Sequence, residues 1–248
     1  MNDDLMMKTV ANGTQMKIST INYFNPGIFM VDDLFTPEEC ERALIEIEDD
    51  AAWTKAKVHT DVGGEEDSRR TNSVSGFQYT GWANTFRARA CGVARMEQFQ
   101  AEGLQLVKYN EGETYGQHKD AFEADGNDPF FKQAGNRVLT GLLYLNDDFE
   151  GGYTTFPHVG KSIKPKQGRA IFFENTNPGS AFPNELSLHS ADPVTSGEKI
   201  AANIWFRAGP FDSELFKQHM GAWYHAGNVP LQWQKYLPKD SIKTSAVV

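Results

Sequence analysis

Apolar positions recur at helical spacing in two segments of the first part of the chain. One helix is predicted over residues 37–49, with Thr36 as its N-cap, Pro37 at its first position and carboxylates in its first turn, which all favour a helix start. Its expected buried face consists of Cys40, Ala43, Leu44 and Ile47. A second helix is predicted over 82–100, where the helical period joins Phe86, Ala90, Val93 and Met96 or Glu97.

After Gly103 the pattern changes to short strands separated by Gly, Pro, Asn and Asp. The predicted strands are 104–109, 138–145, 168–173, 186–189 and 199–207, and a further apolar strand is predicted at 28–32. Helical segments followed by short strands predict a mainly β fold of the α+β class, in which a helical layer supports a sandwich or jelly roll.

We expect a single large domain, because 248 residues form an ordinary length for one unit of this kind. A short helix is predicted at 213–220, and the aromatic tail after it packs back either on the domain or on a partner. The expected divisions are a loose leader at 1–21, a domain at 22–210 with helical support at 22–103 and a β core at 104–208, and a helix with an aromatic tail at 211–248.

Residues 55–75 combine charged, glycine and β-branched residues. This mixture predicts a two-stranded excursion with a mobile tip, for which an ordinary surface hairpin is the simpler interpretation.

Charge and cysteine content narrow the class of protein. The chain has 24 basic and 33 acidic residues, a net charge of −9, which argues against nucleic acid or an anionic membrane as the main partner. Cys40 and Cys91 lie in helical patterns without zinc-ligand spacing, which favours buried apolar roles over a metal site or a disulfide. No apolar run has the length of a signal peptide core or a membrane span. We therefore expect a soluble, cytoplasmic protein.

His118 and Asp120 lie two residues apart in a strand-like context rich in aromatic residues. An extended strand places both side chains on one face, and His189 is the best candidate for a third ligand. Two histidines and one carboxylate on one side of a metal suit non-haem Fe(II), with positions left open for other ligands. A His-x-Asp pair is common by itself, and a solvated pair at a sheet edge is the simpler alternative.

Lys199 strengthens this interpretation, because it follows His189 by ten residues across a segment with turn residues. A strand, a turn and a returning strand would place its ammonium beside the metal. Alternation along 199–207 puts Lys199, Asn203 and Trp205 on a mixed face that could line a pocket. The opposite face is apolar and is expected to pack against the helices; it consists of Ile200, Ala202, Ile204 and Phe206.

Several motifs extend the pattern over residues 26–207. They are FTPEEC at 35–40, RRTNS at 69–73, YNEGETYGQHKD at 109–120, YLN at 144–146, GGYTTFP at 151–157, KPKQG at 164–168 and the segment 189–205. Together they resemble the prolyl 4-hydroxylases of the 2-oxoglutarate- and Fe(II)-dependent dioxygenase superfamily, of the type with a lysine as the 2-oxoglutarate anchor.

The resemblance implies a double-stranded β-helix, or jelly-roll, core with His118, Asp120 and His189 as Fe(II) ligands. Lys199 would bind the distal carboxylate of 2-oxoglutarate. The other positions implied for cosubstrate contact are Tyr109, Tyr144 and Thr155. As an alternative, Tyr109 and Tyr144 could be core aromatics with bonded hydroxyl groups.

On the substrate side, the resemblance implies contacts from Arg70, Tyr115, Arg137 and Trp205. It also makes the 55–75 excursion a mobile finger that closes over a peptide. Arg137 could instead pair with the acidic loop at 123–128.

The implied reaction is 4-hydroxylation of prolyl residues in a peptide or protein, with consumption of O2 and 2-oxoglutarate, release of succinate and CO2, and ascorbate as a candidate reductant. One alternative keeps this chemistry but acts on another side chain or a free amino acid. A second is a non-catalytic jelly-roll binding protein. The insert at 121–136 and the tail at 211–248 depart from the family pattern and leave the substrate open, and the sequence predicts no oligomeric state.

Overall fold

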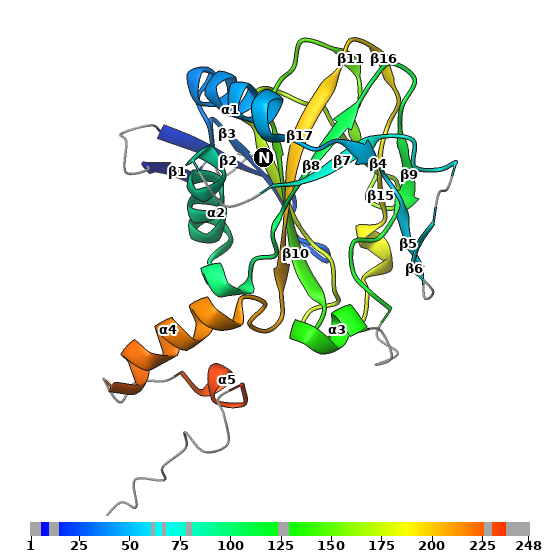
Figure 1. Cartoon of the computed structure of the whole chain (residues 1–248). Coiled ribbons are helices and arrows are strands. Elements are labelled where there is room, and N and C mark those ends of the chain that lie inside the picture. Colours follow the sequence, from blue (N-terminus) through cyan, green and yellow to red (C-terminus); the bar gives the residue numbers. More distant parts are fainter. Residues whose placement is uncertain are drawn as a thin grey trace, which may run out of the picture.

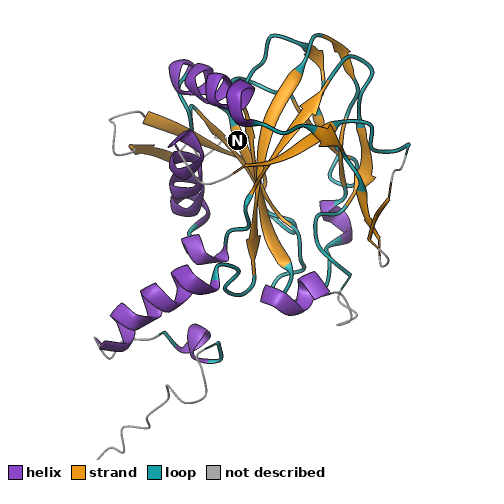
Figure 2. Ribbon diagram, viewed as in Figure 1, coloured by secondary structure: helices purple, strands orange, loops and turns teal. Residues whose placement is uncertain are grey.

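The computed structural model describes residues 6–9, 15–60, 63–65, 68–77, 81–123, 129–225 and 230–236. A nine-stranded antiparallel sheet forms its centre, with helices on one face and a smaller sheet on the other (Figures 1 and 2). The strands of the large sheet, in spatial order, are β1 (Met6–Thr9), β2 (Gln15–Asn22), β3 (Ile28–Asp32), β14 (Ala170–Glu174), β10 (Arg137–Tyr144), β17 (Lys199–Arg207), β8 (Leu104–Tyr109), β7 (Ser73–Phe77) and β4 (Thr54–Lys55).

The remaining strands form smaller sheets. The four-stranded sheet has the order β13 (Lys161–Ile163), β12 (Thr154–Phe156), β15 (His189–Ala191) and β9 (Tyr115–His118), and two pairs are formed by β11 (Glu150–Gly151) with β16 (Val194–Ser196) and by β5 (Val58–Thr60) with β6 (Gly63–Glu65). The helices are α1 (Pro37–Asp50), α2 (Gly81–Ala94), α3 (Pro129–Ala134), α4 (Ser213–His225) and α5 (Leu231–Gln234), and 3-10 turns occur at η1 (Gln98–Gln100) and η2 (Glu185–Ser187).

Side chains from both sheets fill the space between them. Val107, Tyr144 and Phe173 come from the large sheet, and Phe156 and Ile163 come from the small one; all are buried in one cluster. Two facing antiparallel sheets around a shared core are the jelly-roll architecture that the sequence predicts.

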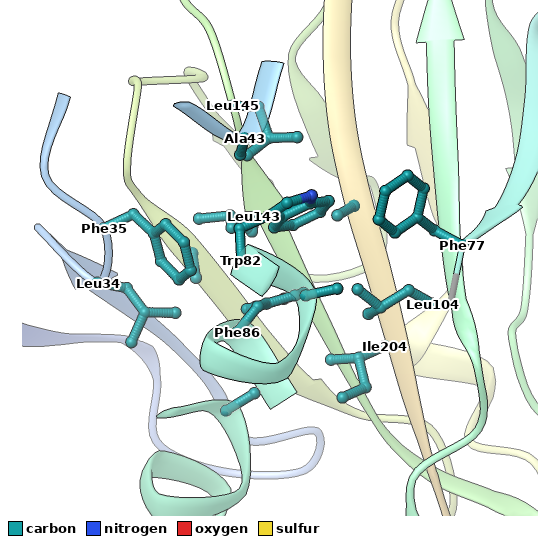
Figure 3. Packing of buried hydrophobic residues seen from close by; sticks show 14 of the residues in the cluster. Leu34, Phe35, Ala43, Phe77, Trp82, Phe86, Leu104, Leu143, Leu145 and Ile204 are labelled. Atoms are coloured by element: carbon teal, nitrogen blue, oxygen red, sulfur yellow. The ribbon is translucent and has the colours of Figure 1, made fainter. Parts of the chain in front are cut away.

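The other face of the large sheet packs against α1 and α2 (Figure 3). Phe86 of α2 lies beside Ile204 of β17 in this second cluster. Ala202, Ile204 and Phe206 are buried there and Ile200 packs against them, which confirms the predicted apolar face of β17.

The predicted start of α1 is confirmed by a capping box. The Thr36 side chain accepts a hydrogen bond from the Glu39 amide (3.3 Å), and the Glu39 carboxylate accepts one from the Thr36 amide (2.9 Å). Arg89 of α2 donates two hydrogen bonds of 2.7 Å to the same carboxylate, so the cap also joins the two helices. Leu44, which we expected to be buried, packs only partly buried at the edge of the core.

The second predicted helix is wrong in its last part. α2 ends at Ala94, where Arg95 takes a left-handed conformation with φ 54°, and a 3-10 turn follows at η1. Met96, which the helical period included, packs against the main core from outside the helix, whereas Phe99 of η1 packs with the C-terminal helices. The two apolar positions therefore belong to different surfaces and not to one helix face.

Two other expectations are corrected. The segment 1–21 is not a loose leader where it is described, because β1 and β2 add strands beyond β3 and Met16 is buried. The predicted strand 186–189 is the turn η2 followed by β15, since the Asn184 side chain accepts a hydrogen bond from the Leu186 amide and caps the turn.

The C-terminal helices pack back on the domain. The predicted helix at 213–220 continues to His225 as α4, and Phe216, Met220 and Trp233 bury Phe99 between them. α4 points away from the sheets (Figure 1). None of the helices in the described part of the chain is long and apolar enough to cross a membrane.

Candidate active site

The structure brings His118, Asp120 and His189 together. His118 and His189 are opposite residues of the neighbouring strands β9 and β15, and the chain bends after β9 so that Asp120 turns toward both. One nitrogen or oxygen from each of the three side chains lies within 4.8 Å of the others. The Asp120 carboxylate is 3.6 Å from His118 Nε2 and 3.8 Å from His189 Nε2. This geometry could hold one metal ion on one face.

Backbone carbonyl groups orient both imidazoles. His118 Nδ1 is 2.8 Å from the Gly116 carbonyl oxygen, and His189 Nδ1 is 3.0 Å from that of Ser187. Because a carbonyl only accepts hydrogen bonds, we assign the ring proton to Nδ1 in each case. The Nε2 lone pairs are then free to bind a metal.

Two residues that the sequence analysis missed hold the carboxylate. The Thr140 hydroxyl of β10 donates a 2.6 Å hydrogen bond to Asp120, and Asn175 Nδ2 donates one of 2.7 Å to Thr140. Thr140 is 1% exposed. The signal in the sequence was a hydroxyl residue within an otherwise apolar strand, which gave no indication of its distant partner.

The ionisation states also suit a metal. Burial, followed by the nearby His189, lowers the pKa of His118. Burial acts to raise the pKa of Asp120, but the two histidines and the Thr140 hydrogen bond outweigh it, so this pKa is lowered. A neutral imidazole and an ionised carboxylate are the forms that bind divalent cations.

A cavity of about 470 Å³ opens over these three side chains. The cavity is also lined by Tyr109, Tyr115 and Lys199, which the sequence analysis had named as candidates. Tyr115 stacks on His118, with ring centroids 3.5 Å apart and an angle of 13° between the planes. The Arg70 guanidinium lies 4.3 Å from the Tyr115 centroid and also lines the cavity.

Lys199 lies in this cavity as a buried cation that is 2% exposed. Its ammonium donates one hydrogen bond, to the Gly152 carbonyl at 2.6 Å, and lies 5.1 Å from the Tyr109 ring centroid. Among the described residues it has no carboxylate within ion-pair distance. Burial lowers the pKa of Lys199 to about 7, although the more distant Asp192 acts to raise it. A buried ammonium with unused donors fits an anionic ligand.

Tyr144 and Thr155 are not placed as the resemblance implies. The Tyr144 hydroxyl donates to Thr154 Oγ1 (2.8 Å) and its ring is buried behind Lys199, outside the cavity lining. Thr155 points to the other face of β12, where it donates to Asp192 (2.7 Å). Thr154 lines the cavity instead, because adjacent strand residues face opposite ways.

Arg137 lies on the cavity wall between two partners. Its guanidinium donates two hydrogen bonds of 2.8 Å to Glu102 and lies 3.8 Å from the Trp205 ring centroid. The alternative pairing with the acidic loop falls on residues 124–128, which lie outside the described residues, and on Glu123, which pairs with Lys119. Arg207, which is fully buried, donates to the same carboxylate at 3.0 Å.

Replacing Glu102 with Gln is expected to lower the free energy of unfolding by about 3 kcal/mol, because removing one partner of a buried ion pair leaves buried charge uncompensated. Chemical denaturation measures this loss. The exposed carboxylate Glu150, changed to Gln, is the matched control and should change stability by no more than about 0.5 kcal/mol. Equal stability of the two variants would contradict a structural role for Glu102.

The finger and the insert border the same cavity. β5 and β6 form the predicted two-stranded excursion, although residues 61–62 and 66–67 of it lie outside the described residues. In the insert, the Asn136 side chain accepts a hydrogen bond from the Phe122 amide and donates one to the Phe122 carbonyl (2.8 Å each). The same side chain also donates to the Ala181 carbonyl. The insert therefore approaches the mouth through Phe122, which lines the cavity.

Comparison with known proteins agrees with this geometry. The model of the 2OG-Fe(II) oxygenase superfamily matches residues 104–207, which contain all three candidate metal ligands and Lys199. Prolyl 4-hydroxylase 13 of Arabidopsis thaliana is 31% identical over 211 residues, which cover 76% of this chain and 74% of that relative. A putative prolyl 4-hydroxylase of Acanthamoeba polyphaga mimivirus is 41% identical over 113 residues, which cover 45% of this chain and 47% of that relative.

A solved structure has the same fold. The viral collagen prolyl hydroxylase of Paramecium Bursaria Chlorella virus-1, in complex with 2-oxoglutarate, superposes with a TM-score of 0.58 at 25% identity, covering 73% of this chain and 94% of that one. The jelly-roll prediction is therefore confirmed.

Proposed function

The chain belongs to the prolyl 4-hydroxylase family and is an Fe(II)- and 2-oxoglutarate-dependent dioxygenase, and we propose that it hydroxylates prolyl residues in a peptide or protein at the 4-position. The observation that carries this proposal is one cavity in which a buried lysine, to which the described residues offer no acidic partner, lies beside two histidines and a carboxylate. The relatives are named for prolyl 4-hydroxylation, which supports the same substrate here.

In this proposal His118, Asp120 and His189 hold Fe(II), and Lys199 binds the distal carboxylate of 2-oxoglutarate. Bound iron and cosubstrate supply the oxidising chemistry, in which O2 and 2-oxoglutarate are consumed, succinate and CO2 are released, and ascorbate is a candidate reductant. Tyr109 forms the wall beside the ammonium, and Thr154 replaces Thr155 as the threonine that borders the cosubstrate.

The protein's own residues orient the reactants and exclude water. Thr140 fixes the direction of the Asp120 carboxylate, and Tyr115 covers one face of the His118 ring. Arg137 and Trp205 form the wall on which substrate would lie. Fixed groups of this kind cost no reorganisation during the reaction, which favours catalysis.

Binding of 2-oxoglutarate is expected to take up a proton above about pH 7. Burial lowers the pKa of Lys199 to about 7, so above that pH the amine is mostly neutral before the cosubstrate arrives. A bound carboxylate favours the charged form and raises this pKa. The apparent affinity is therefore greatest below pH 7 and falls as the pH rises above it. Anaerobic calorimetry at pH 8, in buffers of different ionisation enthalpy, measures the proton uptake, and an affinity that rises with pH would contradict it.

Mass spectrometry of proline-rich peptides tests the proposed function. The iron-loaded protein with 2-oxoglutarate and O2 is expected to add the mass of one oxygen atom to peptides that contain proline, and fragmentation should locate it on the proline ring. Matched peptides with alanine in place of proline should stay unmodified. Succinate formation without peptide modification, or oxidation of free proline alone, would reject the prolyl peptide assignment in favour of another substrate.

A further inference from the structure

The cavity is rich in positive charge although the chain as a whole is acidic. The cations that line it are Lys57, Arg70, Lys119, Arg137 and Lys199, whereas its acidic residues are Asp120 and Glu123. The chain as a whole carries a net charge of −9. A cleft with charge opposite to that of the whole protein attracts ligands of the opposite sign.

Three of these cations already have a partner or a role. Lys199 is assigned to the cosubstrate in the proposed function. Arg137 is paired with Glu102 through two hydrogen bonds. Lys119 donates to Glu123 at 3.2 Å and to Glu185 at 2.7 Å.

Arg70 and Lys57 remain without a carboxylate among the described residues. Arg70 donates one hydrogen bond each to Asn72 Oδ1 (3.3 Å), Gln105 Oε1 (3.2 Å) and the Lys57 carbonyl oxygen (2.9 Å), and all three acceptors are neutral. A guanidinium has five N–H donors, so two remain for a ligand. Because Arg70 binds the backbone of Lys57, the two charges belong to one wall of the cavity.

Arg70 also lies at a defined place relative to the metal ligands. The ring of His118 covers one face of Tyr115, so the guanidinium at 4.3 Å occupies the other face. The cation is thus one aromatic ring away from a metal ligand. Since an extended peptide advances about 3.3 Å per residue, a side chain one or two residues from the reacting proline can reach Arg70.

We propose that this enzyme selects prolyl targets that carry an aspartate or glutamate within two residues of the proline, and that Arg70 and Lys57 bind this carboxylate. The inference rests on the proposed function and adds the sequence context of the target to it. Arg70 offers a planar pair of donors that suits a carboxylate, and Lys57 adds a second, exposed charge on the same cavity wall.

Capped peptides that carry either a carboxylate or the neutral amide at the same position test the preference. Peptides with Asp at each of the two positions before and after proline are compared with peptides that carry Asn at the same positions, with blocked termini. At least one Asp position should raise kcat/KM about tenfold over Asn, which corresponds to about 1.4 kcal/mol. The advantage should shrink at high ionic strength, because salt screens a partly exposed ion pair.

Variants assign the preference to the two cations. Lys57→Gln should lower the Asp-to-Asn ratio in kcat/KM, and Lys57→Glu should bring it to one or below. Arg70→Gln should lower it further. The ratio, measured within one variant, is insensitive to the fraction of protein that folds. Lys161→Gln is the matched control, since Lys161 is exposed on β13 and does not line the cavity; its ratio should equal that of the unmodified protein.

The outcomes separate this inference from the proposed function. Hydroxylation of Asp and Asn peptides at equal rates would overturn the acidic preference and leave prolyl hydroxylation standing. Hydroxylation of no peptide would overturn both. If peptides that end in a free carboxylate directly after proline, or free proline itself, reacted better than every capped Asp peptide, the cations would recognise a main-chain carboxylate, and the inference of an acidic side chain would be overturned.

Discussion

Replacing His118 with Ala is expected to abolish turnover. The imidazole supplies one of three side chains that could bind the metal, and its Nε2 lies 3.6 Å from the Asp120 carboxylate. Removal of residues that merely orient a metal ligand lowers metal affinity about 10- to 100-fold, so loss of a ligand should exceed a hundredfold. Succinate release and anaerobic titration with Fe(II) measure the two effects separately.

The fold should survive this change. His118 lies at the end of β9 and is only partly buried, so removal of its ring leaves the cores of the domain intact. His158→Ala is the matched control, because His158 is exposed and does not line the cavity. The control should keep full turnover and Fe(II) affinity. Normal turnover by the His118 variant, with Fe(II) bound as before, would reject the proposed metal site.

Replacing Lys199 with Met is expected to impair the use of 2-oxoglutarate severely while making the empty protein more stable. Loss of one partner of a buried ion pair costs about 3 kcal/mol or more, which corresponds to a rise in the KM for 2-oxoglutarate of about a hundredfold. Methionine has a similar length and leaves no large cavity. Steady-state kinetics with varied 2-oxoglutarate measure the first effect.

The stability change has the opposite sign for a physical reason. The pKa of Lys199 in the folded chain is about 7 against an ordinary value of 10.5. Between these two values the unfolded chain holds a proton that the folded chain releases, so this lysine lowers the free energy of unfolding of the empty protein. This loss of stability becomes smaller as the pH rises toward 10.5. Methionine removes the loss, and the melting temperature at pH 7.5 should rise.

This combination separates a binding role from a structural one. A lysine needed mainly for folding would make the Met variant less stable, and an unchanged KM for 2-oxoglutarate would contradict its role as the anchor. Lys166→Met is the matched control, since Lys166 is exposed and pairs with Asp33 at the surface. That variant should keep both its KM and its melting temperature close to those of the unmodified chain.

Local patterns in the sequence were enough to predict several elements of the fold. The capping box at Thr36 and Glu39 and the alternating faces of β17 depend on residues close together in the chain, and the structure has both. The meeting of His118 with His189 needed one further assumption, that the two segments form neighbouring strands, and β9 and β15 do so.

Only the tertiary structure decided which polar groups find each other. Glu102 pairs with Arg137 and Arg207 across 35 and 105 residues, and Asn175 reaches Thr140 across 35. Local periodicity carries no information at such separations. The choice of Thr154 over Thr155 depended on the register of a three-residue strand, which is too short to show an alternating pattern.

The sequence alone was enough to name His118, Asp120, His189 and Lys199 as candidate site residues, because motifs and their spacing are local properties of the chain. The absence of an acidic partner for Arg70 among the described residues was decided by the fold. It depends on which side chains converge on Arg70 from β8, the finger and the segment before β7, and this convergence exists only after the sheets have packed.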